Sequence, residues 1–312
     1  MGGGKLTDLQ ITFLGTSASI PTPKRALSAV AIRRKNELIL FDCGEGTQRQ
    51  MIQAGVGFHK PTKIFVTHLH GDHILGLPGL LQTMALLGRS IKVELYGPVG
   101  IKQFIEAINQ TVPHTLTFPL EVYEKTAGIV CDENEYTVQA AESVHIDPSL
   151  VYSFTEKPRP GRFYPKKAKE LGVPEGPLWS KLQAGKQVTL PDGRVVLPET
   201  VLGQPRRGRK IVYTGDTGYS EQVVNLAKNA DLLIHESTFE DELMPRALED
   251  NHSTPSIAAR TAKEADVKQL VLTHISARYN NANMLLEQAQ KIFPNTLVAH
   301  DFLKLELSQI ED

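Results

Sequence analysis

Cysteine is scarce in this chain, because Cys43 and Cys131 are the only two cysteines among 312 residues. A disulfide scaffold or a cysteine-rich structural zinc site would need more thiols than these. Two isolated cysteines in a chain of this length favour a reducing compartment. We therefore expect a cytoplasmic protein that is held together by its core rather than by cross-links.

Long hydrophobic runs are also missing. The longest, Ile74 to Gly88, contains Pro78 and Gln82 and is too short to span a bilayer. The chain begins Met-Gly-Gly-Gly-Lys, with no apolar segment behind it that would make a signal peptide. The composition, 41% hydrophobic and 22% charged, is that of a globular protein. We expect no membrane partner, and one large domain or two smaller ones.

Histidine, by contrast, is concentrated in one stretch. Four potential metal ligands follow the apolar segment 64–67 within six residues: His68, His70, Asp72 and His73. Imidazole and carboxylate at this density suit zinc or similar divalent metals. Residues two apart in an extended segment point the same way, so His68 and His70 are expected to share one metal. After a turn at Gly71, Asp72 and His73 would face a second metal.

Three further ligand candidates stand where apolar strands are expected to end: His145, Asp216 and His274. A lone histidine is usually a surface or core residue, and a histidine-rich loop without metal is the alternative for the first cluster. The shared context of a ligand at a strand end instead predicts one site assembled from several loops. Because no cysteine cluster accompanies it, an open hydrolytic site, with two metals, is favoured over a closed structural one.

The expected elements form two groups around an unusual middle segment. Strands are expected, mostly antiparallel, at 9–14, 28–33, 37–41, 64–67, 92–96, 116–123, 135–141 and 149–154, with helices at 47–53, 77–87 and 100–109. Strands and helices then alternate, with strands at 211–214, 232–235, 269–273 and 297–300 and helices at 220–228, 256–265 and 283–292. We therefore divide the chain into residues 1–155, 156–210 and 211–312, the middle part being an insertion.

The middle segment differs from the remainder in both composition and charge. It holds 8 of the 19 prolines and 7 of the 24 glycines, which predicts irregular structure that projects from the body. It carries 13 Lys and Arg against 5 Asp and Glu, whereas the remainder has 21 against 30. Such asymmetry favours a polyanionic partner, and a solvated lysine-rich loop is the alternative.

Several motifs, in order along the chain, resemble a known family. The segments 67–73, 215–217 and 273–274 resemble the metallo-β-lactamase superfamily. Within it, the segments 41–48, 68–79, 235–239 and 252–254 are similar to the ribonuclease Z family of tRNA 3′-processing endonucleases. The resemblance covers almost the whole chain. It implies a four-layer αββα sandwich with an inserted arm, and two zinc ions per subunit at its edge, or manganese or another divalent metal.

The resemblance also assigns roles to the candidate residues. One zinc would take His68, His70 and His145, the other Asp72, His73 and His274, and Asp216 would bridge both. Asp72 would orient or deprotonate the attacking water as general base, and His252, oriented by Glu236, is the candidate acid or phosphate ligand. Ser253 and Thr254 would lie at the scissile phosphate, although a helix N-cap before Pro255 is an equally good reading of them.

In the resembling family the inserted arm grips tRNA away from the cut. Gly176 and Pro177 look like its Gly-Pro motif, and phosphate contacts would come from Lys166, Lys167, Lys169, Arg206, Arg207 and Arg209. Tyr164 and Trp179 would pack a small core or stack on RNA, and we favour packing for Trp179. One loop, residues 21–27, departs from the family pattern. It keeps Arg25 as a substrate contact but has Ala26 where asparagine is expected, which leaves the cleavage position open.

The activity that this resemblance implies is removal of the 3′ trailer from precursor tRNA, leaving a 3′ hydroxyl on the tRNA and a 5′ phosphate on the trailer. It also implies a homodimer in which the arm of one subunit serves the site of the other, and no nucleotide cofactor is expected. One alternative is a phosphodiesterase of the same fold that acts on other RNA or on small phosphodiesters. Another is an RNA-binding protein without activity. The basic arm argues against small substrates, and the complete ligand set argues against an inactive protein.

Overall fold

The computed structural model describes residues 9–309, which form two compact units. The first contains residues 9–133, 137–154 and 210–308, and the second contains residues 134–136 and 155–209. Within the described residues, no helix combines the length and the apolarity needed to cross a membrane.

The first sheet of the larger unit has the strand order β18-β1-β3-β4-β5-β6-β7. Its strands are β1 (Leu9–Gly15), β3 (Ala29–Arg34), β4 (Glu37–Phe41), β5 (Thr62–Phe65), β6 (Val93–Gly97), β7 (Leu120–Glu124) and β18 (Lys304–Glu306). Strands β18, β1, β3 and β4 pair antiparallel, but β4 to β7 run parallel. The expectation of a mostly antiparallel first half is therefore wrong for these strands. The helices α1 (Thr47–Ala54), α2 (Gly71–Ile74), α3 (Gly76–Leu86) and α4 (Ile101–Thr111) provide the crossovers that parallel pairing needs.

The second sheet has the order β17-β15-β14-β13-β10-β9-β8. Its strands are β8 (Gly128–Asp132), β9 (Tyr136–Glu142), β10 (Leu150–Glu156), β13 (Lys210–Tyr213), β14 (Leu232–Glu236), β15 (Leu270–Thr273) and β17 (Thr296–Val298). The helices of this half are α7 (Glu221–Ala227), η2 (Asp241–Leu243), α8 (Met244–Glu249), α9 (Pro255–Glu264) and α10 (Asn283–Gln290). The short strands β2 (Ser17–Ala18) and β16 (Ile275–Ser276) pair with each other and connect the two halves.

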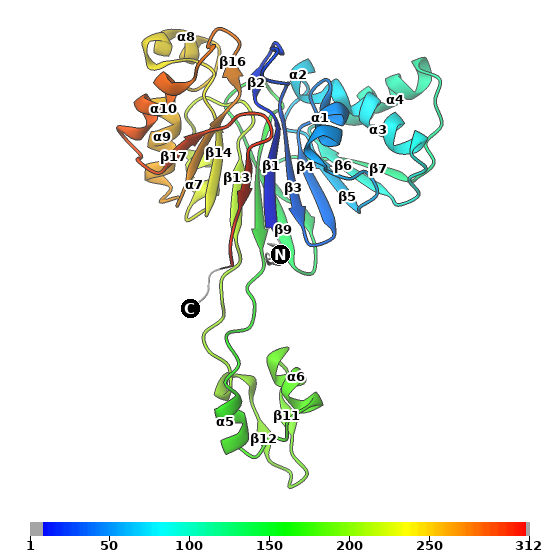
Figure 1. Ribbon diagram of the computed structural model, residues 1–312, viewed down its shortest axis with the longest axis vertical. Helices are drawn as coiled ribbons and strands as arrows, with labels where there is room; N and C mark the ends of the chain where they lie inside the picture. The colour runs from blue at the N-terminus through cyan, green and yellow to red at the C-terminus, as the bar shows by residue number, and fades with distance from the viewer. Residues whose placement is uncertain (1–8, 310–312) are drawn as a thin grey trace, which may run out of the picture. The chain divides into compact units, whose positions relative to one another are not determined.

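The two sheets pack face to face, with helices on both outer faces (Figure 1). Aromatic side chains join the sheets: the ring of Phe41 on β4 lies 5.5 Å from that of Tyr213 on β13, centroid to centroid. Outside the first sheet, α1, α3 and α4 bury an apolar cluster, and α7, α9 and α10 do the same on the second. Burial of these apolar surfaces is the main stabilising contribution. The expected four-layer αββα sandwich is confirmed.

The second unit is more regular than its composition predicts. It contains α5 (Pro165–Glu170), α6 (Pro177–Gln183), a hairpin of β11 (Val188–Thr189) and β12 (Val195–Val196), and the turn η1 (Pro198–Thr200). Pro165 and Pro177 are the first residues of their helices, where a missing N–H costs nothing. Trp179 packs on the small apolar core of this unit and donates its indole N–H to the carbonyl of Val173 at 3.0 Å.

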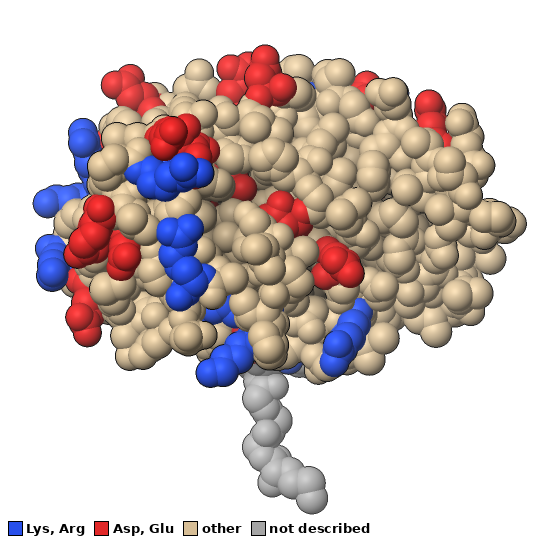
Figure 2. All heavy atoms as spheres, turned by 90° about the horizontal axis from the view of Figure 1, so that it is seen from above, with Lys and Arg blue, Asp and Glu red and all other residues tan. Residues whose placement is uncertain are grey.

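One face of the larger unit is poor in charge. Figure 2 looks down on the edge of the sandwich that carries α2, β2 and β16, and few Lys or Arg lie on its right-hand side, where Figure 1 places α3 and α4. Helix α3 has no charged residue, and Leu86 at its end is 88% exposed. Leu75 directly before α3, Leu87 directly after it and Ile52 on α1 are also exposed.

Candidate active site

All seven predicted metal ligands come together at one edge of the sandwich. Their nitrogen and oxygen atoms fall into two groups in which all atoms lie within 4.8 Å of one another: His68, His70, His145 and Asp216 in one, and Asp72, His73 and His274 in the other. The histidines and aspartates lie in loops or at helix starts that follow strands of both sheets. Asp72 and His73 belong to α2, so this short helix, rather than a sharp turn at Gly71, directs them to the second group.

The distances between ligand atoms are close to those between the ligands of a tetrahedral metal ion. In the first group, His70 Nδ1 lies 3.1 Å from His68 Nε2 and 3.2 Å from His145 Nε2. In the second, His274 Nε2 lies 3.2 Å from Asp72 Oδ2 and 3.4 Å from His73 Nε2. Ligands about 2.0–2.2 Å from a tetrahedral ion are themselves roughly 3.3–3.6 Å apart. Both groups therefore have room for an ion at their centres.

Asp216 belongs to the first group and also forms a group of this kind with His252 and His274. Its Oδ2 lies 3.6 Å from His68 Nε2, and its Oδ1 lies 3.2 Å from His274 Nε2. Oδ1 is buried and has no hydrogen bond from the described residues. A buried carboxylate oxygen without a donor is costly unless a cation is present. Together with five imidazoles, it identifies the cluster as a divalent-metal site.

Asp72 lies at the open side of the second group. Its Oδ2 accepts a hydrogen bond from the backbone N–H of Ser19 at 2.8 Å. Burial would raise the pKa of Asp72, but the neighbouring imidazoles of His274 and His73 outweigh it and hold this pKa well below the usual range. Asp72 is therefore a carboxylate at any physiological pH, able to bind a cation and to accept a hydrogen bond from water.

The sequence analysis gave no role to Asp42, yet this fully buried residue supports the second group. Its Oδ2 accepts from His73 Nδ1 at 2.7 Å and from the hydroxyl of Tyr213 at 2.9 Å, and its Oδ1 accepts the N–H of Thr67 at 2.7 Å. The bond to Nδ1 leaves His73 Nε2 free for a metal. The bond to Thr67 also takes this residue out of the sheet, which is why β5 ends at Phe65 and not at Thr67 as expected. A carboxylate directly after a buried strand was the available signal.

His252 and Glu236 form a closely bonded pair beside the metal ligands. Glu236 is fully buried, and its Oε1 lies 2.7 Å from His252 Nδ1. The ring of His252 is 4.6 Å from that of His145 and 5.7 Å from that of His274, centroid to centroid. Burial lowers the pKa of His252, but the charge and hydrogen bond of Glu236 outweigh it and raise this pKa to about 9. Glu236 thus favours the protonated form of His252.

The two residues that follow His252, Ser253 and Thr254, lead into helix α9. Ser253 and Thr254 are fully buried, and the hydroxyl of Ser253 donates to the carbonyl of Thr217 at 2.6 Å. Thr254 is the N-cap residue of α9, but its side chain makes no capping bond. The N-cap position expected before Pro255 is therefore occupied by Thr254, without a side-chain cap. The expected phosphate contact of these two residues stays a prediction. These residues shape the turn that presents His252.

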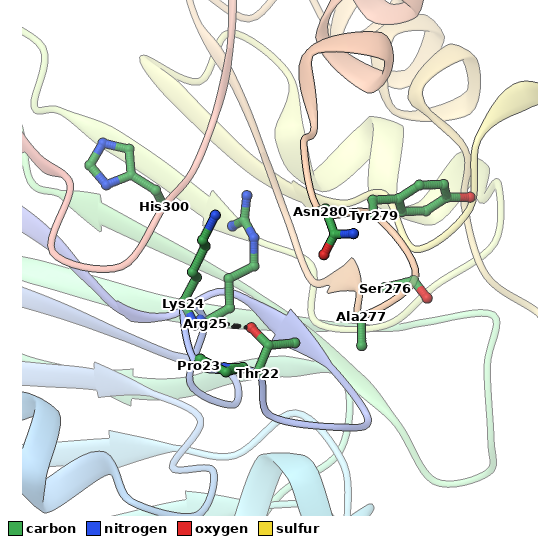
Figure 3. A pocket seen from close by; sticks show the side chains of 9 residues that line it. All are labelled: Thr22, Pro23, Lys24, Arg25, Ser276, Ala277, Tyr279, Asn280 and His300. Atoms are coloured by element: carbon green, nitrogen blue, oxygen red, sulfur yellow. Dashed lines mark hydrogen bonds between the residues drawn. The ribbon is translucent and has the colours of Figure 1, made fainter.

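Arg25 is bonded to other groups of the protein. Its Nη1 donates to Thr16 Oγ1 and to the carbonyl of Ala299, both at 2.7 Å. The loop that carries it forms one wall of a pocket of about 290 Å³, with residues 276–280 opposite and His300 at one side (Figure 3). Arg25 therefore anchors the loop, with Lys24 beside it, and its expected contact with substrate stays a prediction. The backbone N–H of Ala26 donates to Asp301 Oδ2 at 2.7 Å, which fixes the loop without an asparagine side chain.

Among the predicted cations of the second unit, Arg209 is the exception. It is only 2% exposed and forms a bidentate ion pair with Glu156, with Nε–Oε2 at 2.7 Å and Nη2–Oε1 at 2.8 Å. Because this guanidinium is buried and paired, phosphate cannot reach it, so its expected contact is wrong. Of the other predicted cations, Lys166, Lys167, Lys169 and Arg207 are exposed, and Arg206 is half-buried. Gly176 and Pro177, at the start of α6, are exposed as well.

Comparisons with known proteins agree with this geometry. Residues 9–117 match the family described as anti-Pycsar protein Apyc1, and residues 200–275 match a beta-lactamase superfamily domain. The chain is 49% identical over 300 residues to the ribonuclease Z of Methanosarcina acetivorans, covering 96% of this chain and 98% of the relative. It is 46% identical to that of Methanothermobacter thermautotrophicus, covering 96% and 97%.

Solved structures give the same result. The crystal structure of human tRNase Z, short form, superposes with a TM-score of 0.70 at 33% identity, covering 95% of this chain and 98% of that one. The metallo-beta-lactamase fold protein YhfI from Bacillus subtilis, at 19% identity and a TM-score of 0.68 over 96% and 99% of the two chains, supports the fold alone. With nearly full-length relatives at this level of identity, the chain belongs to the ribonuclease Z family.

Proposed function

We propose that the protein is an endoribonuclease that removes the 3′ trailer from precursor tRNA. The observation that carries the proposal is the convergence of seven ligand atoms on two adjacent metal positions, with the His252–Glu236 pair next to them, in a member of the ribonuclease Z family. The products would be a tRNA with a 3′ hydroxyl and a trailer with a 5′ phosphate.

Asp72, His252 and Glu236 each have a separate role in the proposed reaction. Two zinc ions, or another divalent pair, would polarise a phosphoryl oxygen and make bound water more acidic. Asp72 accepts a hydrogen bond from the attacking water and so orients it toward phosphorus. His252, in its protonated form, donates a proton to the ribose 3′ oxygen as it leaves, and Glu236 holds the imidazole in place and stabilises its charge.

The cations of the second unit favour RNA over a small substrate. Lys166, Lys167, Lys169 and Arg207 are exposed, and contacts of this kind bind the phosphate backbone without reading its sequence. Gly176 and Pro177 would join this surface. A phosphodiesterase for small molecules gains nothing from it, so we place that activity second. In the larger unit, Lys24 and the pocket of Figure 3 would face the RNA near the cut, with Arg25 as the anchor of their loop.

The direct test is cleavage of a precursor tRNA by the zinc-loaded or manganese-loaded protein, with both new ends mapped. We expect a single cut just after the discriminator nucleotide, a 3′ hydroxyl on the tRNA and a 5′ phosphate on the trailer. Absence of cleavage of any precursor by fully loaded protein would exclude the proposal. Cleavage of small phosphodiesters alone would favour the alternative.

The two thiols are consistent with the cytoplasm that we propose as its compartment. Cys43 and Cys131 are free and buried. Burial raises the pKa of Cys43 to about 12 and that of Cys131 to about 11, so both are unreactive thiols.

We also propose that the protein is a homodimer, each subunit supplying its second unit to the site of the other. The exposed apolar side chains on and beside α3 support a contact there. Leu86→Glu places a charge in that contact and is expected to give monomers in sedimentation velocity runs, where the wild type sediments as a dimer. Leu248→Glu is the matched control, because Leu248 is 58% exposed but lies on α8, over the other sheet. A monomeric wild type, or equal dissociation of both variants, would contradict this interface.

A further inference from the structure

Glu236 bonds to more groups than its partnership with His252 requires. Its Oε1 accepts the backbone N–H of Thr217 at 3.0 Å as well as His252 Nδ1. Its Oε2 accepts the backbone N–H of Thr238 at 3.1 Å and lies 2.7 Å from the hydroxyl oxygen of the same residue. Both oxygens of this buried carboxylate thus act as acceptors, and Thr238 is bonded to it twice.

The hydroxyl of Thr238 continues this network into the metal site. Its Oγ1 lies 2.9 Å from Nδ1 of His274, whose Nε2 faces Asp216 and, in the second ligand group, Asp72. A hydroxyl has one hydrogen to donate. The carboxylate oxygen at 2.7 Å is a better acceptor for it than the carbonyl of His274 at 3.3 Å. The bond to His274 must therefore be donated by Nδ1–H, which leaves the lone pair on Nε2 for a metal.

The backbone of His274 makes this support necessary. Its φ is +55°, in the left-handed region that residues other than glycine rarely adopt. The imidazole is therefore directed by its neighbours rather than by a relaxed backbone. His73, the other imidazole of the group, is bonded directly to the carboxylate of Asp42 at 2.7 Å. Among the described residues, Nδ1 of His274 reaches a carboxylate through the hydroxyl of Thr238.

We propose that Thr238 is a positioning residue whose hydroxyl fixes the tautomer and direction of His274 and links this metal ligand to the carboxylate that orients His252. One carboxylate then orients two imidazoles, His252 directly and His274 through Thr238. Loss of the hydroxyl weakens metal binding, although Thr238 itself is not a ligand. The role given to His252 rests on the proposed function, but the effect on metal binding does not.

The test is zinc affinity without RNA, measured by competition with a chromophoric chelator. Thr238→Val keeps the shape and removes the hydroxyl, and we expect a loss of about 10- to 100-fold in affinity for the weaker-bound zinc. Thr238→Ser keeps the hydroxyl and is expected to retain the wild-type affinity. In proton–nitrogen spectra of the imidazoles of the zinc-loaded protein, the Nδ1–H signal of His274, assigned with His274→Asn, should persist in Thr238→Ser and be lost or broadened in Thr238→Val.

Thr261→Val controls for the loss of a buried threonine hydroxyl. Thr261 is fully buried in α9, and its hydroxyl has no hydrogen-bond partner among the described residues, so zinc affinity should not change. Wild-type affinity in Thr238→Val would overturn the proposal, and so would an equal loss in Thr238→Val and Thr238→Ser, which would point to packing. Because no RNA is present, a protein that fails to cut tRNA can still pass this test.

Discussion

Asp72→Ala is expected to abolish cleavage of precursor tRNA while leaving RNA binding intact. The substitution removes one ligand of the second group and the carboxylate that orients the attacking water. General acid–base contributions alone are typically worth about 10² to 10⁴ in rate, so we expect kcat to fall by at least about 10³-fold. The cations of the second unit are unchanged, and the Kd for precursor tRNA should therefore stay at the wild-type value.

Single-turnover cleavage and filter binding on the same preparations check this prediction. Asp72→Asn preserves the shape of the side chain and removes its charge, and it should be nearly as inactive as the alanine variant. Thermal melting by circular dichroism tests whether both variants remain folded. Binding that falls in parallel with cleavage would mean that Asp72 supports the substrate surface rather than the reaction.

Deletion of residues 157–209 is expected to impair cleavage of precursor tRNA but not hydrolysis of a small phosphodiester. The cut ends lie close together, because the N–H of Glu156 donates to the carbonyl of Arg209 at 2.9 Å and β10 and β13 are neighbours in the sheet. A short Gly-Ser linker can therefore join Glu156 to Lys210. Without the exposed cations we expect KM for precursor tRNA to rise on the order of 100-fold. Hydrolysis of bis(p-nitrophenyl) phosphate, which is too small to reach these cations, should be unaffected.

Charge reversal provides a milder form of the same experiment. Lys166→Glu combined with Arg207→Glu should raise KM in the same direction and reduce its dependence on salt, because fewer counterions are released on binding. Both side chains are exposed, so the fold should tolerate the change. An equal loss of activity on tRNA and on the small phosphodiester after deletion would show that this segment supports the larger unit instead.

The ligands were predictable from sequence because their signals are local. His68 and His70 are two residues apart in an extended segment, and Asp216 and His274 each follow an apolar strand, so each could be found without knowledge of its neighbours. The layer order was also predictable, through the family motifs. The parallel pairing of β4 to β7 was missed, although the helices expected at 47–53, 77–87 and 100–109 are the crossovers that such pairing needs.

What the sequence could not reveal depends on contacts between distant segments. Nothing in the sequence distinguishes Arg207 from Arg209. In the structure Arg209 is buried in an ion pair with Glu156, whereas Arg207 is exposed. Asp42 and Thr238 gain their roles from residues distant in the sequence, His73 and His274 respectively. The proline content predicts irregular structure, but Pro165 and Pro177 begin helices, and composition does not say whether a proline begins a helix or interrupts one.

The ligands of the second metal position are shared between early and late parts of the polypeptide. Asp72 and His73 precede β6, whereas His274 follows β15, near the end of the chain. During translation, Asp72 and His73 leave the ribosome long before His274 is made. Such an incomplete chain lacks a full set of donors, so nuclease activity begins only when synthesis is nearly finished and the final strands have docked.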